Sequence, residues 1–385
     1  MSCVARFVDW GLTRALPFWE ERAWDRRSGG FLESLSFDGL PISGDIRRVR
    51  TQARQIFVFA RAHLEGWCDG RDLALEGYGL LERRAHAPDG KPGWVHRLTD
   101  SGEVADPLRD LYDHAFILLA QAWMYRLTGD QYFRTAATDV LGFLDERFAE
   151  SSGGYRENIG GVALPRRQNP HMHLFESLLA WHQVTSDPAY LKRADNIAEL
   201  LLRAFLNQSE GWLGEFFDDE LAPLDGRVGK LVEPGHEFEW VWLLADYCKA
   251  GGDIPAGVSE VLYDHAMRHG RNSDRGFAQK VISASGKPVE AGSRTWVQTE
   301  WLRATLARQR AGYAGAIEES EEAARQLLKW HLDPAIPGGW IDHFDADGLR
   351  VADRMPASTL YHLLGAVEDA HRMIGDIGKT TGNAL

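Results

Sequence analysis

The stretch "NPHMHLFESLLAW" (residues 169–181) decides the fold, because its plan recurs along the whole chain. Polar residues open it, and an apolar run with helical periodicity follows. Five other stretches share this plan: "RVRTQARQIFVFARA" (48–62), "DLYDHAFILLAQAW" (110–123), "EPGHEFEWVWLLA" (233–245), "RTWVQTEWLRATLA" (294–307) and "PASTLYHLLGAVEDA" (356–370). Each contributes one polar marker, namely Arg54, His114, His173, His236, Glu300 and His362, at steps of 60, 59, 63, 64 and 62 residues. These near-equal steps predict six structural repeats.

A second series of short motifs runs in step with the first. Gly-aromatic pairs stand about twenty residues before each marker, at Gly30-Phe31, Gly93-Trp94, Gly154-Tyr155, Gly211-Trp212, Gly276-Phe277 and Gly339-Trp340. Their glycines are 63, 61, 57, 65 and 63 residues apart. A unit of about 60 residues holds two helices with their loops, so each repeat is predicted to be a helical hairpin.

The second helix of a repeat is visible at residues 128–148 and 185–205. Both segments begin Thr-x-Asp, in which the Asp can cap a helix N-terminus, and both continue with helical spacing of apolar residues. Strand signals are short and confined to the Gly-aromatic segments, such as "GGWIDHFDADG" (338–348), where a small hairpin is expected.

Six hairpins can stack as an open solenoid or close into a ring. In a closed ring the inner helices are buried on every side, and "AFILLAQAW" (115–123) and "FEWVWLLADY" (238–247) are apolar all round. We therefore predict an all-α fold: one (α/α)6-barrel domain over residues 1–385, with short β-hairpins in the loops. The first turns of the inner helices should converge at one end and gather the polar markers into one pocket.

Composition excludes several partners. The formal net charge of −13 leaves no basic stripe for nucleic acid, and no segment approaches the roughly 18 apolar residues of a membrane span. The N-terminus lacks a continuous apolar signal segment, and the three cysteines show no Cys-x-x-Cys spacing. We expect a cytoplasmic protein without nucleic-acid or membrane partners, present as a monomer or homodimer.

The marker residues leave several chemistries open. A metal site could assemble across the ring from His114, His173, His236 and His362. Glycoside cleavage by Glu176, Glu239 and Glu300 is also compatible with such a barrel. Nucleotide-binding and nucleophile-elbow motifs are absent from the sequence. Histidine outnumbers carboxylate among the markers and suits proton transfer near neutrality, so we favour acid–base chemistry without metal or cofactor.

Five motifs resemble the N-acylglucosamine 2-epimerase superfamily, which includes bacterial mannose isomerases, sulfoquinovose isomerase and cellobiose 2-epimerases. They are "RVRTQAR", "NPHMHLFESLL", "PGHEFEWVWLL", "TWVQTEWLRA" and "LYHLL", one per repeat and in order along the chain. Within the superfamily, Asn-Pro-His-Met-His-Leu is similar to the isomerase branch. The resemblance implies the same (α/α)6 barrel as the repeat argument.

The resemblance also implies an activity and a set of site residues. The expected reaction is the interconversion of D-mannose and D-fructose through a cis-enediol, without metal or cofactor; the alternatives are a sugar 2-epimerase of the N-acylglucosamine or cellobiose type and a non-enzymatic carbohydrate-binding barrel. His362 would act at C2, His236 in ring opening, and Arg54 beside the enediolate oxygen. The complete expected set is His236, His362, Arg54, Glu239 and Glu300 for catalysis, and Tyr112, His114, Asn169, His173, Glu176 and Trp296 for sugar binding.

The two histidines of the opening stretch should differ. Residues two apart on a helix point about 200° away from each other, so only one of His171 and His173 can face a pocket. We expect His173 to point inward, with Glu176 and Ser177 next along the inner face. For His114 and His171 a purely structural role stays equally open.

Overall fold

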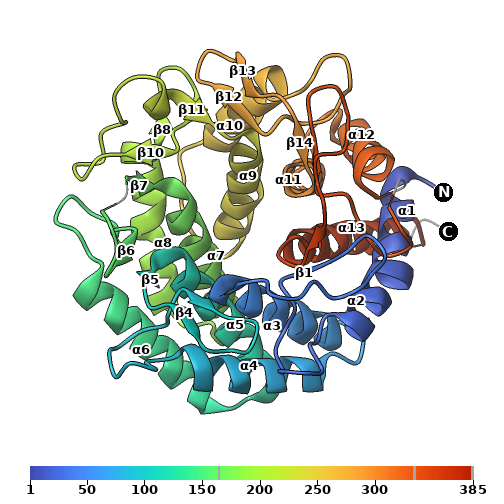
Figure 1. The fold of residues 1–385 in the computed structure, drawn as a ribbon. Helices are drawn as coiled ribbons and strands as arrows, with labels where there is room; N and C mark the ends of the chain where they lie inside the picture. The colour runs from blue at the N-terminus through green and yellow to red at the C-terminus, as the bar shows by residue number, and fades with distance from the viewer. Residues whose placement is uncertain (164, 333–334, 383–385) are drawn as a thin grey trace.

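The computed structural model describes residues 1–163, 165–332 and 335–382, and it forms a ring of helices around a central axis (Figure 1). Six inner helices surround this axis, and each contacts the next. They are α3 (Val49–Leu64), α5 (Leu111–Thr128), α7 (Gln168–Thr185), α9 (Pro234–Lys249), α11 (Thr295–Arg310) and α13 (Thr359–Gly382). Because α13 packs against α3, the ring is closed. The predicted (α/α)6 barrel is therefore confirmed.

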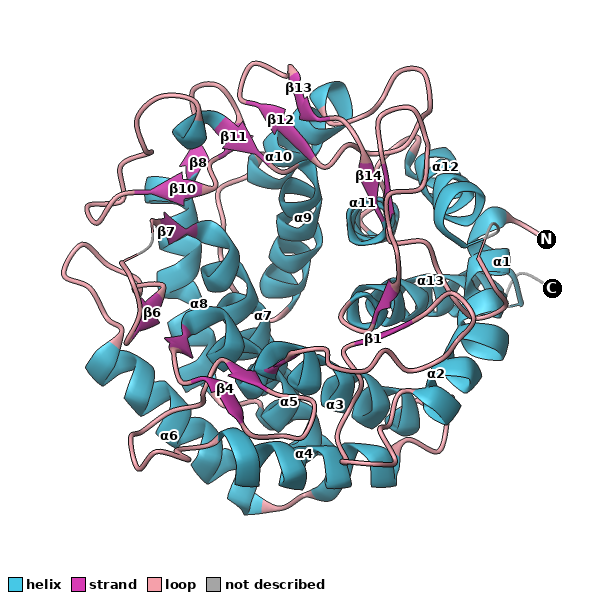
Figure 2. Cartoon of the chain, viewed as in Figure 1, coloured by secondary structure: helices cyan, strands magenta, loops and turns pink. Residues whose placement is uncertain are grey.

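The outer layer surrounds this ring (Figure 2). Its helices are α1 (Cys3–Trp10), α2 (Leu16–Arg22), α4 (Arg71–Ala85), α6 (Gln131–Arg147), α8 (Pro188–Leu200), α10 (Val258–His269) and α12 (Ala316–Leu327). π-Helical turns join α1 to α2 and extend two of the others, at η1 (Gly11–Ala15), η2 (Leu201–Phe205) and η4 (Leu328–Leu332); a short 3₁₀ turn, η3, covers Val228–Lys230.

Five helix pairs are consecutive hairpins, and the sixth joins the two ends of the chain. Each inner helix from α3 to α11 packs against the outer helix that follows it, whereas α13 packs against α1 and η1. The contact is close, since a Cβ on Gly11 would lie 2.4 Å from a methyl of Val367. The sixth repeat is thus completed by the N-terminal helix.

The helices begin and end where local chemistry requires it. The side chains of Asp130 and Asp187 accept hydrogen bonds from the first turns of α6 and α8, as the two Thr-x-Asp segments predict. Helix α5 ends at Gly129, which adopts a φ of 71° that residues with a Cβ rarely reach. The inner helix α5 is buried on almost every side, because α3, α6 and α7 surround it.

Short strands connect neighbouring repeats on one end of the ring. A strand precedes each inner helix and pairs with a strand of the next loop: β2 with β3, β5 with β6, β7 with β10, β11 with β12, β14 with β15, and β16 with β1. Their bounds are β1 (Ser34–Leu35), β2 (Arg47–Arg48), β3 (Arg97–Leu98), β4 (Val104–Asp106), β5 (Arg109–Asp110), β6 (Asn158–Ile159), β7 (Arg166–Arg167), β8 (Leu206–Asn207), β9 (Trp212–Leu213), β10 (Phe216–Phe217), β11 (Leu231–Val232), β12 (Val281–Ser283), β13 (Pro288–Glu290), β14 (Ser293–Arg294), β15 (His343–Phe344) and β16 (Met355–Pro356). The hairpin expected within residues 338–348 extends two residues beyond that range, because Phe344 is bridged to Arg350 across the turn.

The Gly-aromatic pairs have a structural role that repeats around the ring. A buried side chain of an inner helix accepts a hydrogen bond from a backbone N–H at or directly after the aromatic residue. The five acceptor–donor pairs are Gln52 with Phe31, His114 with Trp94, His171 with Tyr155, Glu237 with Leu213, and Gln298 with Ala278. We call these contacts the repeat latches.

The glycine allows the latch to close. Gly154 has a φ of 63°, and a Cβ there would lie 2.8 Å from Nε2 of His171. Each latch therefore ties a loop to its inner helix, which explains the common spacing of the two sequence series.

A search of the described residues finds no helix both long and apolar enough to cross a membrane.

Candidate functional site

A polar cavity of about 230 Å³ opens where the first turns of the inner helices converge. All six inner helices contribute to it, as do the residues directly before α3, α9, α11 and α13. Its lining consists of Arg48, Arg50, Arg54, Tyr112, Asn169, His173, Glu233, His236, Glu239, Arg294, Trp296, Ser358, Thr359 and His362.

The lining follows helical geometry. Two inner helices present lining residues four apart, which lie one above the other on the same helix face: Arg50 and Arg54 of α3, and Asn169 and His173 of α7. In α13 the lining residue His362 follows Ser358, which stands directly before the helix. In α5 the corresponding pair is Tyr112 and Phe116, whose rings stack beside His173.

His236 is held as an imidazolium. Its Nδ1 lies 2.9 Å from Oε1 of Glu215, a buried carboxylate in the loop between β9 and β10. Burial by itself would lower the pKa of His236, but the nearby carboxylates of Glu215 and Glu233 outweigh it and raise the pKa to about 10. At neutral pH this ring therefore carries a proton that it can donate.

His362 has the opposite protonation state. Burial and then the positive charge of Arg54 lower its pKa well below the ordinary value, so the ring is neutral. Its Nδ1 lies 2.8 Å from Oε1 of Glu300, whose other oxygen accepts a hydrogen bond from Trp242 Nε1 at 2.7 Å. An Nδ1–H donor to this carboxylate leaves Nε2 with its lone pair, the form that can accept a proton.

His173 is a second neutral imidazole in the same cavity. Burial lowers its pKa to about 4, although the Glu176 carboxylate 3.1 Å from Nδ1 opposes this shift. Tyr361 donates a hydrogen bond to the same carboxylate, and Glu239 lies 3.8 Å from Nε2. Burial and then the negative charge of Glu300 raise the pKa of Glu239 well above its usual range.

Arg54 supplies the cavity with a positive charge that no carboxylate neutralises. Within the described part of the chain it makes no ion pair; it donates a hydrogen bond to Tyr112 at 2.8 Å and lies against the rings of Phe116 and Tyr361. Three buried polar atoms around this charge have no hydrogen-bond partner among the described residues: Arg54 Nε, Asn169 Oδ1 and Glu239 Oε1. Unsatisfied buried polar groups are costly, so this arrangement fits a polar, hydroxyl-rich ligand.

Trp296 forms one wall between His236 and His362, the two histidines that differ in protonation state. Its ring centroid lies 5.1 Å from that of His236 and 5.8 Å from that of His362. The two imidazoles thus flank one aromatic surface on which a sugar ring can pack.

Eight of the eleven expected site residues line this cavity: Arg54, Tyr112, Asn169, His173, His236, Glu239, Trp296 and His362. Glu176 and Glu300 lie beneath it and contact His173 and His362 rather than the open space. Ser177, expected next to Glu176 on the inner face, donates its hydroxyl to the carbonyl of Leu174.

His114 does not line the cavity. Its Nε2 accepts the latch hydrogen bond from Trp94 N–H at 3.0 Å, and its Nδ1 lies 2.7 Å from the carbonyl of Asp110. Both ring nitrogens are hydrogen-bonded within the protein, so His114 can bind neither a sugar nor a metal ion in this position. We therefore do not retain it as a site residue. His171 is fixed in the same way, between Tyr155 N–H and the carbonyl of Arg167.

Several cavity residues were not expected from the sequence. Glu215 and Glu233 surround His236, and the mouth adds Arg48, Arg50, Arg294, Ser358 and Thr359. Glu233 and Arg294 stand within the recurring polar clusters and were visible there, whereas Glu215 lies outside both sequence series. Only the three-dimensional fold brings Glu215 to His236.

Three donor sets at the site could hold a metal ion. Each combines one histidine with two carboxylates whose donor atoms lie within 4.8 Å: His173 with Glu176 and Glu239, His236 with Glu215 and Glu233, and His362 with Glu239 and Glu300. A fourth set, His96 with Asp110 and Asp113, lies beside Arg50. The cross-ring site of four histidines is not formed, because His114 faces away from the cavity.

Comparisons with known proteins agree with this architecture. The family model described as N-acylglucosamine 2-epimerase matches residues 29–366. A protein named mannose-6-phosphate isomerase from Rhizobium meliloti (strain 1021) is 34% identical over 93% of this chain and 94% of its own length. A D-mannose isomerase from Thermobifida fusca is 29% identical over 84% of this chain and 87% of its own length.

Solved structures share the fold. A crystal structure of D-mannose isomerase superposes with a TM-score of 0.84 at 21% identity, covering 95% of this chain and 97% of that one. The cellobiose 2-epimerase of Spirochaeta thermophila DSM 6192 gives a TM-score of 0.85 at 20% identity, with 97% of each chain covered. The fold, the extent of the family match and the relatives together show that this chain is an enzyme of the N-acylglucosamine 2-epimerase family, whose relatives are sugar isomerases and epimerases.

Proposed function

We propose that this enzyme is an aldose–ketose isomerase that interconverts D-mannose and D-fructose through a cis-enediol. One observation carries the proposal: the cavity holds a protonated imidazole, His236, and a neutral imidazole, His362, beside the unpaired charge of Arg54. Such a set can donate a proton, accept a proton and stabilise the anion formed between the two steps.

Ring opening is the first task. The imidazolium of His236 protonates the ring oxygen, and the anomeric hydroxyl gives its proton to a neutral group of the cavity, from which the proton returns to His236 and restores the imidazolium. The unpartnered Asn169 Oδ1 and Glu239 Oε1 then accept hydrogen bonds from sugar hydroxyls, which holds the open chain in place.

Isomerisation follows on the open chain. Nε2 of His362 takes the proton from C2, the electron pair moves into the C1–C2 bond, and negative charge develops on O1. Arg54 stabilises this charge, and His236 protonates O1 to give the enediol. Removal of the O2 proton by His236 and return of the proton from His362 to C1 complete the ketose. Acid–base steps of this kind contribute about 10²–10⁴-fold each.

The charge of the cavity favours an unphosphorylated sugar. Among the arginines of the lining, Arg48, Arg50 and Arg294 are ion-paired with Glu33, Asp113 and Asp342. Their charge is already compensated, so the mouth offers no unpaired cluster for a phosphate. The name of the Rhizobium meliloti relative nevertheless makes D-mannose 6-phosphate the necessary comparison substrate.

A 2-epimerase is the second candidate, and His173 favours it. Epimerisation at C2 needs a proton returned on the opposite face, and His173 is a second neutral imidazole of the cavity. Several relatives are also named epimerases, including the cellobiose 2-epimerase of Bacteroides fragilis, 24% identical over 87% of this chain and 89% of its own length.

Product analysis in D₂O separates these candidates. The purified enzyme is incubated with D-mannose, D-mannose 6-phosphate, N-acetylglucosamine and cellobiose, and the products are resolved by NMR. Fructose formed from D-mannose, with deuterium at C1, supports the proposal. Products formed only from D-mannose 6-phosphate would show that the phosphorylated sugar is the substrate. Formation of 2-epimers without ketose would show that the enzyme is a 2-epimerase. Binding of a sugar without turnover would show that the protein is a carbohydrate-binding barrel and not an isomerase.

We further propose that residues 1–385 form one catalytic domain located in the cytoplasm and active as a monomer or homodimer. The continuous ring of six repeats supports the first part. The free thiols of Cys3, Cys68 and Cys248 are compatible with a reducing compartment.

A further inference from the structure

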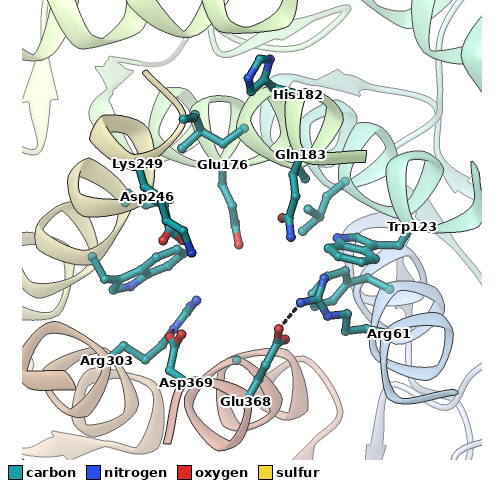
Figure 3. Close-up of a pocket in the computed structure, with 18 of the residues that line it drawn as sticks. Arg61, Trp123, Glu176, His182, Gln183, Asp246, Lys249, Arg303, Glu368 and Asp369 are labelled. Atoms are coloured by element: carbon teal, nitrogen blue, oxygen red, sulfur yellow. Dashed lines mark hydrogen bonds and ion pairs between the residues drawn. The ribbon is translucent and has the colours of Figure 1, made fainter. Parts of the chain in front are cut away.

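Arg303 is not among the residues that line the sugar cavity. It belongs to α11 and lines a second cavity of about 330 Å³, to which all six inner helices contribute (Figure 3). The guanidinium carbon is 3.3 Å from the centroid of the Trp242 ring, and Nε is 2.9 Å from Oδ2 of Asp369. The side chain is therefore fixed on two sides.

The same guanidinium faces the carboxylate that holds His362. Arg303 Nη1 lies 3.6 Å from Oε2 of Glu300, while Oε1 of Glu300 lies 2.8 Å from Nδ1 of His362. Trp242 is part of this connection, because it stacks against Arg303 and donates its indole N–H to Glu300. A chain of direct contacts thus joins Arg303 to the imidazole.

Glu300 needs a positive neighbour to remain ionised. It is fully buried, and burial raises its pKa above the ordinary value, while Arg303 gives the largest effect in the opposite direction. The other charged or titratable groups facing the carboxylate come from three helices: His173 and Glu176 of α7, Glu239 of α9, and His362 and Asp369 of α13. Three of these are carboxyl groups, which disfavour another negative charge.

The ionisation of Glu300 decides which nitrogen of His362 carries the proton. A carboxylate only accepts hydrogen bonds, so it fixes the proton on Nδ1 and leaves the Nε2 lone pair free. A protonated carboxyl group can donate to Nδ1 instead, which stabilises the tautomer whose Nε2 cannot accept a proton. Loss of the correct tautomer is among the most damaging changes known for histidine bases.

We propose that Arg303 is a positioning residue that acts on His362 through Glu300 and maintains the tautomer needed to take the C2 proton. This rests on the proposed role of His362. It adds a residue that touches neither the sugar cavity nor the imidazole.

Arg61 provides a matched control in the same cavity. Its guanidinium carbon lies 3.6 Å from the ring of Trp123, and it is ion-paired with Glu368, the residue next to Asp369. Like Arg303 it is buried, and Figure 3 shows the two arginines at separate positions of the cavity wall. In the part of the chain that the structure describes, no hydrogen bond or ion pair connects its partners, Glu368 and Glu65, to Glu300.

The test compares Arg303→Met, Arg303→Lys and Arg61→Met in the full-length enzyme. We expect Arg303→Met to lower kcat about 10²-fold with KM changed less than about 3-fold, and to move the acid limb of the kcat–pH profile to higher pH. Arg303→Lys should recover at least about 10-fold of the lost kcat, because it keeps a positive charge. Arg61→Met should lower the melting temperature but leave kcat and the acid limb unchanged.

Two further measurements keep the proposal falsifiable. If Arg303→Met does not fold, the double substitution Arg303→Lys/Glu300→Gln tests the proposal instead. Because Arg303 is proposed to act only through Glu300, the double variant should have a kcat no lower than that of Glu300→Gln alone. Nitrogen-15 NMR should show His362 protonated on Nδ1 in the wild-type enzyme and on Nε2 in Arg303→Met, with Arg303→Lys closer to the wild type. The NMR result holds whether or not D-mannose is the substrate, so failure of the proposed function is distinguishable. Unchanged tautomers, or equal losses of kcat in the Arg303 and Arg61 variants, would overturn the proposal.

Discussion

The indole of Trp296 packs directly against the backbone of Gly235, so that a Cβ on this glycine would lie 2.4 Å from Cζ3 of the ring. The glycine stands one residue before His236 in the first turn of α9, and Trp296 stands in the first turn of α11. Since the same ring contacts both His236 and His362, the spacing of the two imidazoles depends on this missing side chain.

Gly235→Ala should therefore displace Trp296. Overpacking of this kind costs about 1–3 kcal/mol, and we expect kcat/KM to fall at least about 10-fold. Steady-state kinetics and calorimetry measure the two effects. The control is Gly142→Ala, a helical glycine of α6 with no atom within 4 Å of the position that a Cβ would take, which should be stabilised by roughly 0.5–1 kcal/mol with unchanged kinetics. Wild-type kinetics in Gly235→Ala would contradict the prediction.

The pH dependence of kcat should report the two imidazoles. Activity should increase as His362 loses its proton, well below pH 6.5, and decrease as His236 loses its proton near pH 10. Glu215→Gln removes a charge that raises the pKa of His236, so the basic limb should move to lower pH while the acid limb stays in place. Rate–pH profiles of both proteins test this, and an unmoved basic limb would argue against His236 as the acid.

The repeat latch at His171 should make stability depend on pH. Burial lowers the pKa of folded His171 to about 4 from its ordinary 6.5, and in this neutral form Nε2 accepts the Tyr155 N–H. The unfolded chain binds this proton below about pH 6.5 and the folded chain only near pH 4, so stability present above pH 6.5 is lost on acidification between these values. His171→Gln copies the latch of Gln52 and Gln298 and should reduce that loss by about 2–3 kcal/mol. Urea unfolding at pH 7.5 and 4.5 measures it, and an unchanged difference would refute the assignment.

Alanine substitutions should separate the two histidines of "NPHMHL". His173→Ala removes a cavity imidazole and should lower kcat by about 10²-fold or more. His171→Ala leaves the Tyr155 N–H without its acceptor and should cost about 2–4 kcal/mol of stability with little change in kcat. Kinetics and denaturant unfolding of both variants decide the matter; equal losses of kcat would mean that both rings take part in the reaction.

Metal removal tests the proposed route through imidazoles. Isomerases that transfer hydride use divalent ions, whereas an enediol route by proton transfer does not require one. We expect full activity after exhaustive dialysis against EDTA. Loss of activity that a divalent ion restores would assign one of the three histidine–carboxylate sets to a metal.

The ring and most of the cavity could be predicted from sequence because both depend on a repeat. The register of that repeat could not. The five inner helices from α3 to α11 carry a latch residue, and in α3, α7 and α9 the residue two positions later lines the cavity, as His173 does after His171. In the second repeat the position equivalent to His173 is Phe116, which is apolar. The search for polar markers therefore took the latch residue His114 in its place.

Glu215 shows a different limit. It is neither helical nor part of a repeated motif, and only the folding of one loop over α9 brings it to 2.9 Å from His236. Sequence spacing reports residues that share an element, whereas this contact joins two elements 21 positions apart. The protonation state of His236 therefore became apparent only with the structure.

Pairing of α13 with α1 has a consequence for how the enzyme is made. During synthesis the hairpins from α3 to α12 emerge in order and can pack against one another. The helix α1 stays without its partner α13 until that helix has been translated. That partner also carries His362. If His362 has the proposed role, a nascent chain is inactive until α13 has left the ribosome, so that ring closure and catalytic competence arise together.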